Sequence, residues 1–267
     1  MATILGARAS AATAKSHPRF RYESDLVSVL HDGLSSLVFS HSIQTQVRTF
    51  SEVPAVHGIP DLASIRFDWR AIEQRIRAGI MPLSTDIEVR AVKSLASSPK
   101  TMKELATDMR VTSDYVRRSI VPLLEAQGWI SNSDKVLSLV PDAVPVGIKV
   151  VTVEAKLRDW HKALGQARRQ QLSADVAYIA LDAGSVNAAP DELRYVAQKG
   201  IGIITVDAGT SKARIWARPT KQLVTARSSV GRMLIAERCF AMWQRGEQHG
   251  QIHPVFGWTR PDDLDSL

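Results

Sequence analysis

One stretch, VGIKVVTVEAK at residues 146–156, decides the fold of this chain. Residues 146–153 are mostly apolar, as is typical of a strand buried inside a sheet. Only Lys149 and Thr152 interrupt the apolar run. Because side chains alternate between the two faces of a strand, we expect Glu154 and Lys156 on one face. A carboxylate and an ammonium group would then meet where a buried strand ends.

Helical and extended patterns alternate on both sides of this stretch. Apolar residues spaced by three and four predict helices, and short apolar or alternating runs predict strands. The expected helices cover residues 24–39, 68–79, 160–171, 191–199 and 228–245. The expected strands cover residues 43–50, 59–67, 146–153, 176–181, 201–206 and 213–217. This alternation predicts an α/β fold with a mixed sheet.

Residues 83–140 have a different pattern. Thr101-Met102-Lys103-Glu104 is a capping box at a helix start, and Thr112 opens the next helix. Pro122 is expected to kink that helix, and residues 131–134 are expected to form a turn between two short strands. Three helices, a tight turn and a hairpin in this order resemble the winged helix-turn-helix family.

This resemblance implies a chain in three parts. The winged helix would be an insert at residues 83–140, and the α/β core would be discontinuous, formed by residues 21–82 and 141–267. The first 22 residues hold four Arg or Lys and no acid, which favours a disordered basic arm at residues 1–20. An organellar transit peptide is the alternative for this segment.

Composition limits the class of protein. Lys and Arg number 34 against 27 Asp and Glu, and the net charge of +7 mildly favours a polyanionic partner. Cys239 is the only cysteine, which excludes an intrachain disulfide and a cysteine-rich zinc site and fits a reducing cytosol. No apolar run approaches the roughly 20 residues that span a bilayer. We therefore expect a cytoplasmic protein without a membrane partner.

Acidic residues in the chain suit phosphodiester hydrolysis. Asp61 follows Ile59-Pro60 on an expected strand, far upstream of Glu154. Carboxylates can hold Mg²⁺, which activates water and neutralises the charge that builds on the phosphate. Asp61 and Glu154 would be the ligands, with the carbonyl of Ala155 as a further one. Lys156 would touch the attacking water or a phosphate oxygen, and Mn²⁺ could replace Mg²⁺.

The order of these residues resembles the PD-(D/E)xK nuclease superfamily. The resemblance implies that Asp61 and Glu154 bind the metal, that Lys156 is the catalytic lysine, and that Glu23 is the optional acid of the first helix. The alternative for the isolated Glu154-Ala155-Lys156 is a surface ion pair at a strand end. The alternative for Glu23 is a carboxylate favoured by the helix dipole. The insert accounts for the long separation, 154 − 61 = 93 positions, between the two acids.

Further contacts are expected from two helices. Gln166 resembles the glutamine of the Gln-x-x-x-Tyr motif in RecB-like nucleases, although Gln170 stands where that motif has tyrosine. Lys162 and Arg169 would contact the DNA backbone, unless they belong to a solvated helix face. In the winged helix, the expected DNA contacts are Tyr115, Arg117 and Arg118.

The leading hypothesis is a Mg²⁺-dependent DNA endonuclease. A non-catalytic DNA-binding regulator on the same fold is the first alternative. The second is a nuclease subunit of a defence or transposition complex, in which the winged helix binds a protein partner. Cutting both strands with one site per chain needs a second copy, so a homodimer is also compatible with the sequence. The histidines show no metal-type pairing within a helix, and we expect them to be scattered through the surface and core.

Overall fold

The computed structural model describes residues 18–186, 190–220 and 226–250. Most of the predicted basic arm, residues 1–17, lies outside the described residues. None of the helices in the described ranges is long and apolar enough to cross a membrane.

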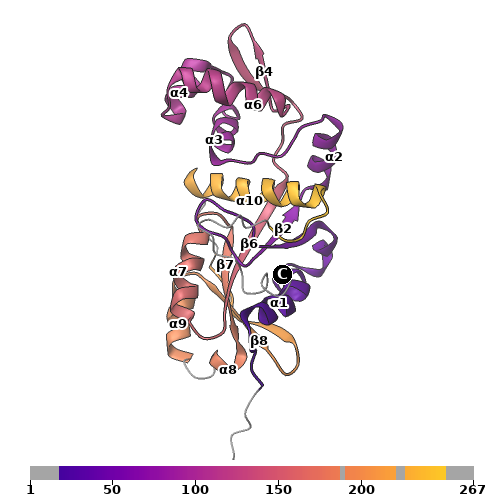
Figure 1. The fold of residues 1–267 in the computed structure, drawn as a ribbon, viewed down its shortest axis with the longest axis vertical. Helices are drawn as coiled ribbons and strands as arrows, with labels where there is room; N and C mark the ends of the chain where they lie inside the picture. The colour runs from indigo at the N-terminus through magenta and orange to yellow at the C-terminus, as the bar shows by residue number, and fades with distance from the viewer. Residues whose placement is uncertain (1–17, 187–189, 221–225, 251–267) are drawn as a thin grey trace, which may run out of the picture.

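A six-stranded mixed sheet forms the centre of the molecule, in the order β1-β2-β6-β7-β8-β9 (Figure 1). The strands are β1 Val47–Ser51, β2 Leu62–Phe67, β6 Gly147–Lys156, β7 Val176–Asp182, β8 Gly202–Asp207 and β9 Lys212–Ala217. Neighbours β6, β7 and β8 run parallel, whereas the other pairings are antiparallel. The predicted α/β class with a mixed sheet is confirmed.

Helices cover both faces of this sheet. On one face, α1 (Glu23–Val38) buries a stripe of leucines against strand residues such as Val151, Val153 and Tyr178. On the other face, α7 (Trp160–Gln170) and α9 (Pro190–Gln198) pack on β7 and β8. The rest of that second face is covered by α2 (Trp69–Arg77) and α10 (Ala226–Gln244). The short helix α8 (Ala183–Val186) follows β7 directly.

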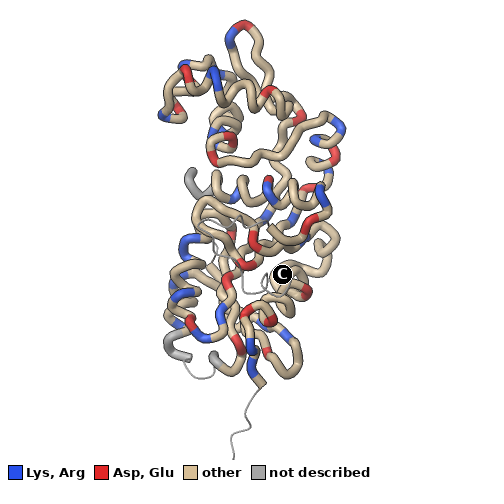
Figure 2. The backbone as a smooth tube through the Cα atoms, in the orientation of Figure 1, with Lys and Arg blue, Asp and Glu red and all other residues tan. Residues whose placement is uncertain are grey.

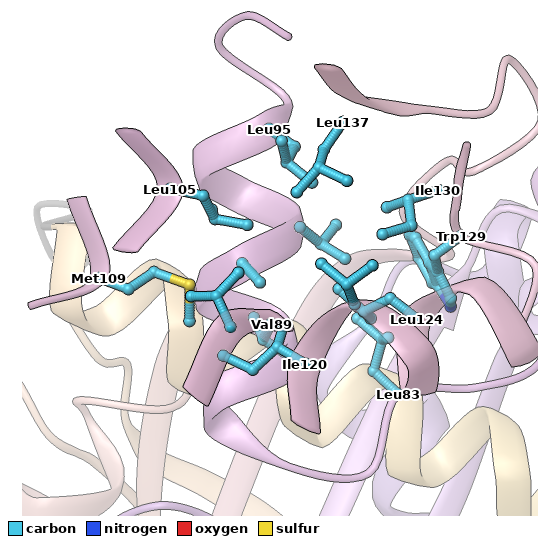
Figure 3. Close-up of a cluster of buried hydrophobic side chains, with 14 of the residues drawn as sticks. Leu83, Val89, Leu95, Leu105, Met109, Ile120, Leu124, Trp129, Ile130 and Leu137 are labelled. Atoms are coloured by element: carbon cyan, nitrogen blue, oxygen red, sulfur yellow. The ribbon is translucent and has the colours of Figure 1, made fainter. Parts of the chain in front are cut away.

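A second group of elements packs on the far side of α10 (Figure 1). Its elements are α3 Asp86–Leu95, α4 Met102–Met109, α5 Ser113–Tyr115, α6 Val121–Ala126 and the strands β3 Lys100–Thr101, β4 Ile130–Ser133 and β5 Val136–Leu139. The three strands form a sheet of order β3-β5-β4. These elements share one apolar core around Leu105, Leu124 and Trp129 (Figure 3), and Leu234 of α10 joins it. The helix α10 therefore contributes to the cores on both of its sides.

A buried ion pair joins the two groups of elements at α10. The guanidinium of Arg75 donates to both carboxylate oxygens of Glu237, at 2.7 and 3.0 Å, and neither side chain is exposed. The Leu83 N–H donates to the same carboxylate, and Arg75 also donates to the Met81 carbonyl. The indole of Trp129 lies 4.4 Å from the guanidinium and donates to the same Met81 carbonyl. The hydrogen bonds of this junction are therefore nearly complete.

The expected strand over residues 43–50 is wrong in its first half. Residues His41–Gln46 form the 3-10 helix η1, and the strand begins only at Val47. The side chain of Gln44 donates to the carbonyls of Ser35 and Phe39 and so satisfies the end of α1. This local capping is incompatible with the extended backbone that the alternating pattern predicts.

Two smaller expectations also need correction, and the structure adds a detail to a third. Asp61 lies immediately before β2 rather than within a strand. The expected turn at residues 131–134 is shifted, since Asp134 and Lys135 have the positive φ angles of the turn. The helix in which a kink is expected at Pro122 contains a π-helical turn, Val116–Ile120, and Pro122 lies in the first turn of α6, directly after it. A π turn accommodates the missing proline N–H without ending the helix.

Candidate active site at the end of strand β6

The ammonium group of Lys156 is the centre of a cluster of oxygen atoms. Its Nζ lies 2.6 Å from an oxygen of Glu23 and 2.6 Å from the carbonyl of Ala155. The same atom lies 3.1 Å from Glu154 and 3.8 Å from Asp61. Four residues that the sequence analysis selected from three separate segments are therefore brought together around one lysine.

The strand pairing explains how Asp61 reaches this cluster. Leu62 of β2 pairs with Val153 of β6, so the next position outward places Asp61 beside Glu154. The carboxylate of Asp61 accepts a hydrogen bond of 2.7 Å from the backbone N–H of Ala155. Although Asp61 lies outside the strand, this hydrogen bond ties its side chain to β6.

Glu154 is buried and held by a glutamine of the following helix. Its carboxylate is only 1 % exposed, and the amide of Gln170 donates to it at 2.7 Å. Gln170 belongs to the buried face of α7, one turn after Gln166. The amide oxygen of Gln166 is buried and has no hydrogen-bond partner in the described parts of the chain. The structure thus links Gln170, rather than the predicted Gln166, to the acids.

The electrostatic state of the cluster follows from burial and crowding. Burial, together with the nearby charge of Asp61, raises the pKa of Glu154 to about 7. Burial also raises the pKa of Asp61, although Lys156 and the Ala155 N–H oppose this rise. Burial would lower the pKa of Lys156, but the hydrogen bond to Glu23 and the charges of Asp61 and Glu154 outweigh it, so that pKa is raised. Three acids thus compete for one ammonium ion.

The residues present fit a hard divalent cation by their chemistry. Asp61, Glu154 and the carbonyl of Ala155 offer only oxygen atoms, the ligands that Mg²⁺ and Mn²⁺ prefer. All three offer an oxygen within 3.8 Å of the Lys156 Nζ, so the oxygens already surround a positive charge. Among the described residues, no group of three or more His, Cys, Asp or Glu side chains is placed so that it could hold a metal ion by itself.

A pair of histidines that the sequence analysis did not connect lies near the acids. The rings of His31 and His249 stack with centroids 6.1 Å apart, and Nδ1 of His249 is 2.8 Å from the hydroxyl of Ser51. Both rings line a pocket of about 530 Å³ that also contains Glu23 and Asp61. The expectation of scattered histidines is therefore wrong for these two. No local spacing could have shown this pair, because α1 and the segment after α10 are far apart in sequence.

The residues predicted to contact DNA lie on two separate surfaces. Lys162 and Arg169 are exposed on α7, and Figure 2 shows Lys and Arg along that helix. Arg117 and Arg118 are also exposed, but both pair with Asp114, at 2.6 and 3.0 Å. Tyr115 is 43 % exposed on the same surface. The cations of α7 thus lie in the group of elements that carries the acidic cluster, whereas the others lie beyond α10.

Comparisons of this chain with protein-family models, with curated proteins and with solved structures find no match.

Proposed function

We propose that this chain is a Mg²⁺-dependent DNA endonuclease that hydrolyses phosphodiester bonds. The observation that carries the proposal is the convergence of Glu23, Asp61, Glu154 and Lys156 at the end of β6. A simple surface ion pair would leave both partners in solvent. Here the Glu154 side chain is 1 % and the Lys156 side chain 12 % exposed, and burial of unbalanced acids is a feature of functional sites.

Each residue of the cluster has a distinct proposed role. Asp61 and Glu154 would hold the ion together with the Ala155 carbonyl, and the ion would supply charge neutralisation and a more acidic water. Lys156 would place its ammonium against a phosphate oxygen or the attacking water. Glu23 positions that ammonium, and Gln170 fixes the orientation of the Glu154 carboxylate.

We also propose the finer description of the fold. The central sheet with its acidic strand end would be a PD-(D/E)xK-like core, and residues 83–140 would be an inserted winged helix. The order of α3, α4, the α5–α6 segment and the β4–β5 hairpin supports the second assignment. The apolar core that these elements share, to which α10 adds Leu234, supports their treatment as a unit.

A specific observation favours protein binding, as a second candidate role, for the insert. Arg117 and Arg118 both pair with Asp114, whose single negative charge offsets part of their positive charge and so reduces their attraction for phosphate. Tyr115 and Leu123 expose apolar surface on the same segment, at 43 % and 41 %. If the insert binds a protein partner, this chain would be a nuclease subunit. A homodimer would supply the second active site for cutting both strands.

Plasmid nicking tests the nuclease proposal. Supercoiled plasmid and a branched oligonucleotide are incubated with Mg²⁺ or Mn²⁺ and either the wild type, Glu154→Gln or Lys156→Met. We expect metal-dependent cleavage by the wild type and a loss of about a hundredfold to a thousandfold in each variant. Glu73→Gln, which changes an exposed carboxylate on α2, is the matched control and should cleave normally.

Two results would count against the proposal. Cleavage that survives in both site variants would place the activity outside this cluster. The absence of cleavage by the wild type on both substrates, with DNA binding intact, would favour the non-catalytic regulator.

A further inference from the structure

The acidic cluster lies between two pockets of opposite charge. The pocket with the histidine pair is lined by Glu23, Asp32, Glu52 and Asp61, and by no Lys or Arg among the described residues. A second pocket, of about 360 Å³, shares Glu23 but also includes Lys156 and three arginines, Arg19, Arg21 and Arg158. We call this second pocket the arginine pocket. A polyanion would be repelled by the first pocket and attracted by the arginine pocket.

The arginines of this pocket are available for a ligand. Their side chains are exposed, and within the described ranges none of the three forms an ion pair. The guanidinium of Arg21 lies 5.1 Å from the centroid of the Tyr22 ring.

The acids of the arginine pocket already have partners. Asp159 caps α7 by accepting from the Lys162 N–H, and Asp182 accepts from the N–H groups of Phe20 and Gly184. The third acid, Glu23, is bonded to Lys156. The pocket therefore holds four cationic side chains against three carboxylates, and the hydrogen bonds of these carboxylates go to groups other than the three arginines.

The segment with Arg19 and Arg21 is seated on the core. Its Phe20 N–H donates to Asp182 at the end of β7, at 3.3 Å. Pro18 packs against Gly209, where an added Cβ would come within 2.6 Å of the proline ring. Glycine thus permits the close approach that holds this segment beside the end of β6. A seated segment presents its guanidinium groups at a defined place next to Lys156.

We propose that Arg19, Arg21 and Arg158 form a subsite for the nucleic-acid backbone, which binds a phosphate next to the one held at Lys156. The position of the subsite rests on the proposed nuclease function, because it assigns the scissile phosphate to Lys156. The subsite would define the path of the substrate strand over the protein, from the arginine pocket across the end of β6. Guanidinium groups suit this role because they offer paired N–H donors to phosphate oxygens. Their contacts carry affinity and position rather than base specificity.

The test measures binding separately from cleavage. A fluorescein-labelled DNA duplex is titrated with protein in EDTA over a series of salt concentrations. The triple variant Arg19→Gln, Arg21→Gln, Arg158→Gln is compared with a control triple variant, Arg77→Gln, Lys199→Gln, Arg245→Gln. The control removes the same charge from exposed positions on α2, after α9 and after α10. Thermal melting checks that both variants are folded.

We expect the pocket variant to bind more than about tenfold more weakly than the control at moderate salt. The slope of log affinity against log salt should fall by about two to three, since each phosphate contact contributes about 0.9. Equal affinity and slope in the two variants would overturn the subsite, as would a wild type that does not bind DNA.

The nicking assay separates this inference from the proposed function. If the pocket variant loses DNA binding and the wild type does not cleave, the backbone-binding site is supported and the nuclease proposal is rejected. Normal cleavage with binding equal to that of the control would retain the nuclease and reject the subsite.

Discussion

Among the described residues, the ion pair at the α10 junction and the acidic cluster at the end of β6 are both buried, and they differ in charge balance. At the α10 junction, one guanidinium of Arg75 meets one carboxylate of Glu237, and both carboxylate oxygens accept hydrogen bonds. Burial raises the pKa of Glu237, although Arg75 and the Leu83 N–H oppose this rise. At the end of β6, one ammonium of Lys156 meets three carboxylates beside two pockets.

This difference separates a structural ion pair from a candidate active site. A buried charge costs free energy unless it is paired and fully hydrogen-bonded, and the junction nearly meets that condition. The cluster at the end of β6 does not meet this condition, because three carboxylates share one ammonium group there. We interpret this excess as capacity for a further cation, which the junction lacks.

The largest expected effect is on stability at the junction. Arg75→Met leaves the carboxylate of Glu237 buried without its partner, and we expect a loss of about 3–5 kcal/mol in the free energy of unfolding. Urea denaturation measures this loss. Arg77→Met, in the exposed pair of α2 with Glu73, is the matched control and should change little.

A second substitution sharpens this test. Removing both charges, as Arg75→Met with Glu237→Leu, should restore much of the lost stability, because no unpaired charge remains. If Arg75→Met costs no more than Arg77→Met, the junction is not the balanced structural pair that the comparison assumes.

The next largest effect is a pH-dependent difference in stability between the wild type and Glu154→Gln. The pKa of Glu154 is about 7 in the folded protein and 4.5 as its ordinary value. The folded state therefore binds the Glu154 proton more tightly than the unfolded state does. The stability that this proton contributes is fully present below pH 4.5 and is lost as the pH rises through 7. Glu154→Gln removes the loss, so the variant should be more stable than wild type at pH 8, by at most about 3 kcal/mol.

Thermal and urea unfolding at pH 4.5 and pH 8 provide the measurement. The two proteins should differ little at the lower pH. A variant that is less stable than wild type at pH 8 would show that the negative charge of Glu154 stabilises the fold, contrary to the proposed imbalance.

A smaller effect distinguishes the two glutamines of α7. Gln170→Leu removes the donor that orients Glu154, and we expect Mn²⁺ affinity or metal-dependent nicking to fall about tenfold to a hundredfold. Gln166→Leu replaces an amide whose oxygen lacks a partner among the described residues, so it should have little effect. Calorimetric titration with Mn²⁺ compares them. Equal losses in both variants, or a loss only in Gln166→Leu, would favour the prediction made from the sequence motif.

The smallest effect is expected in the insert. Arg117 and Arg118 are already paired with Asp114, so Arg117→Gln combined with Arg118→Gln should lose less DNA affinity than the arginine-pocket variant, whose arginines form no ion pair among the described residues. The same salt-dependent titration measures both. A loss as large as that of the arginine pocket would restore the insert as the main DNA contact and would count against its role in protein binding.

Local patterns in the sequence were sufficient for most of the regular elements. The apolar run before Glu154 predicts β6, and the strand period of two correctly relates Glu154 to Lys156, as their distance of 3.1 Å shows. The spacing of leucines at Leu26, Leu30 and Leu34 likewise predicts the buried face of α1. These features depend on backbone geometry over a few residues, which the sequence expresses directly.

The family resemblance supplied a part of the site that periodicity could not. Nothing in the local patterns relates Glu23 or Asp61 to Lys156, yet their order along the chain led us to group them. The structure brings them within 2.6 and 3.8 Å of its ammonium group. The nuclease activity and the bound Mg²⁺ that the resemblance implies remain proposals for the nicking assay.

Only the tertiary structure decided which polar groups meet. Gln170, rather than Gln166, reaches Glu154, because the packing of α7 on the sheet fixes which face of the helix is turned toward β6. His31 and His249 stack because α1 and the segment after α10 cross beside the acids. By itself, the sequence determined most of the strands and helices and the chemical types at the end of β6. The pairings depend on packing between distant segments, for which no local period exists.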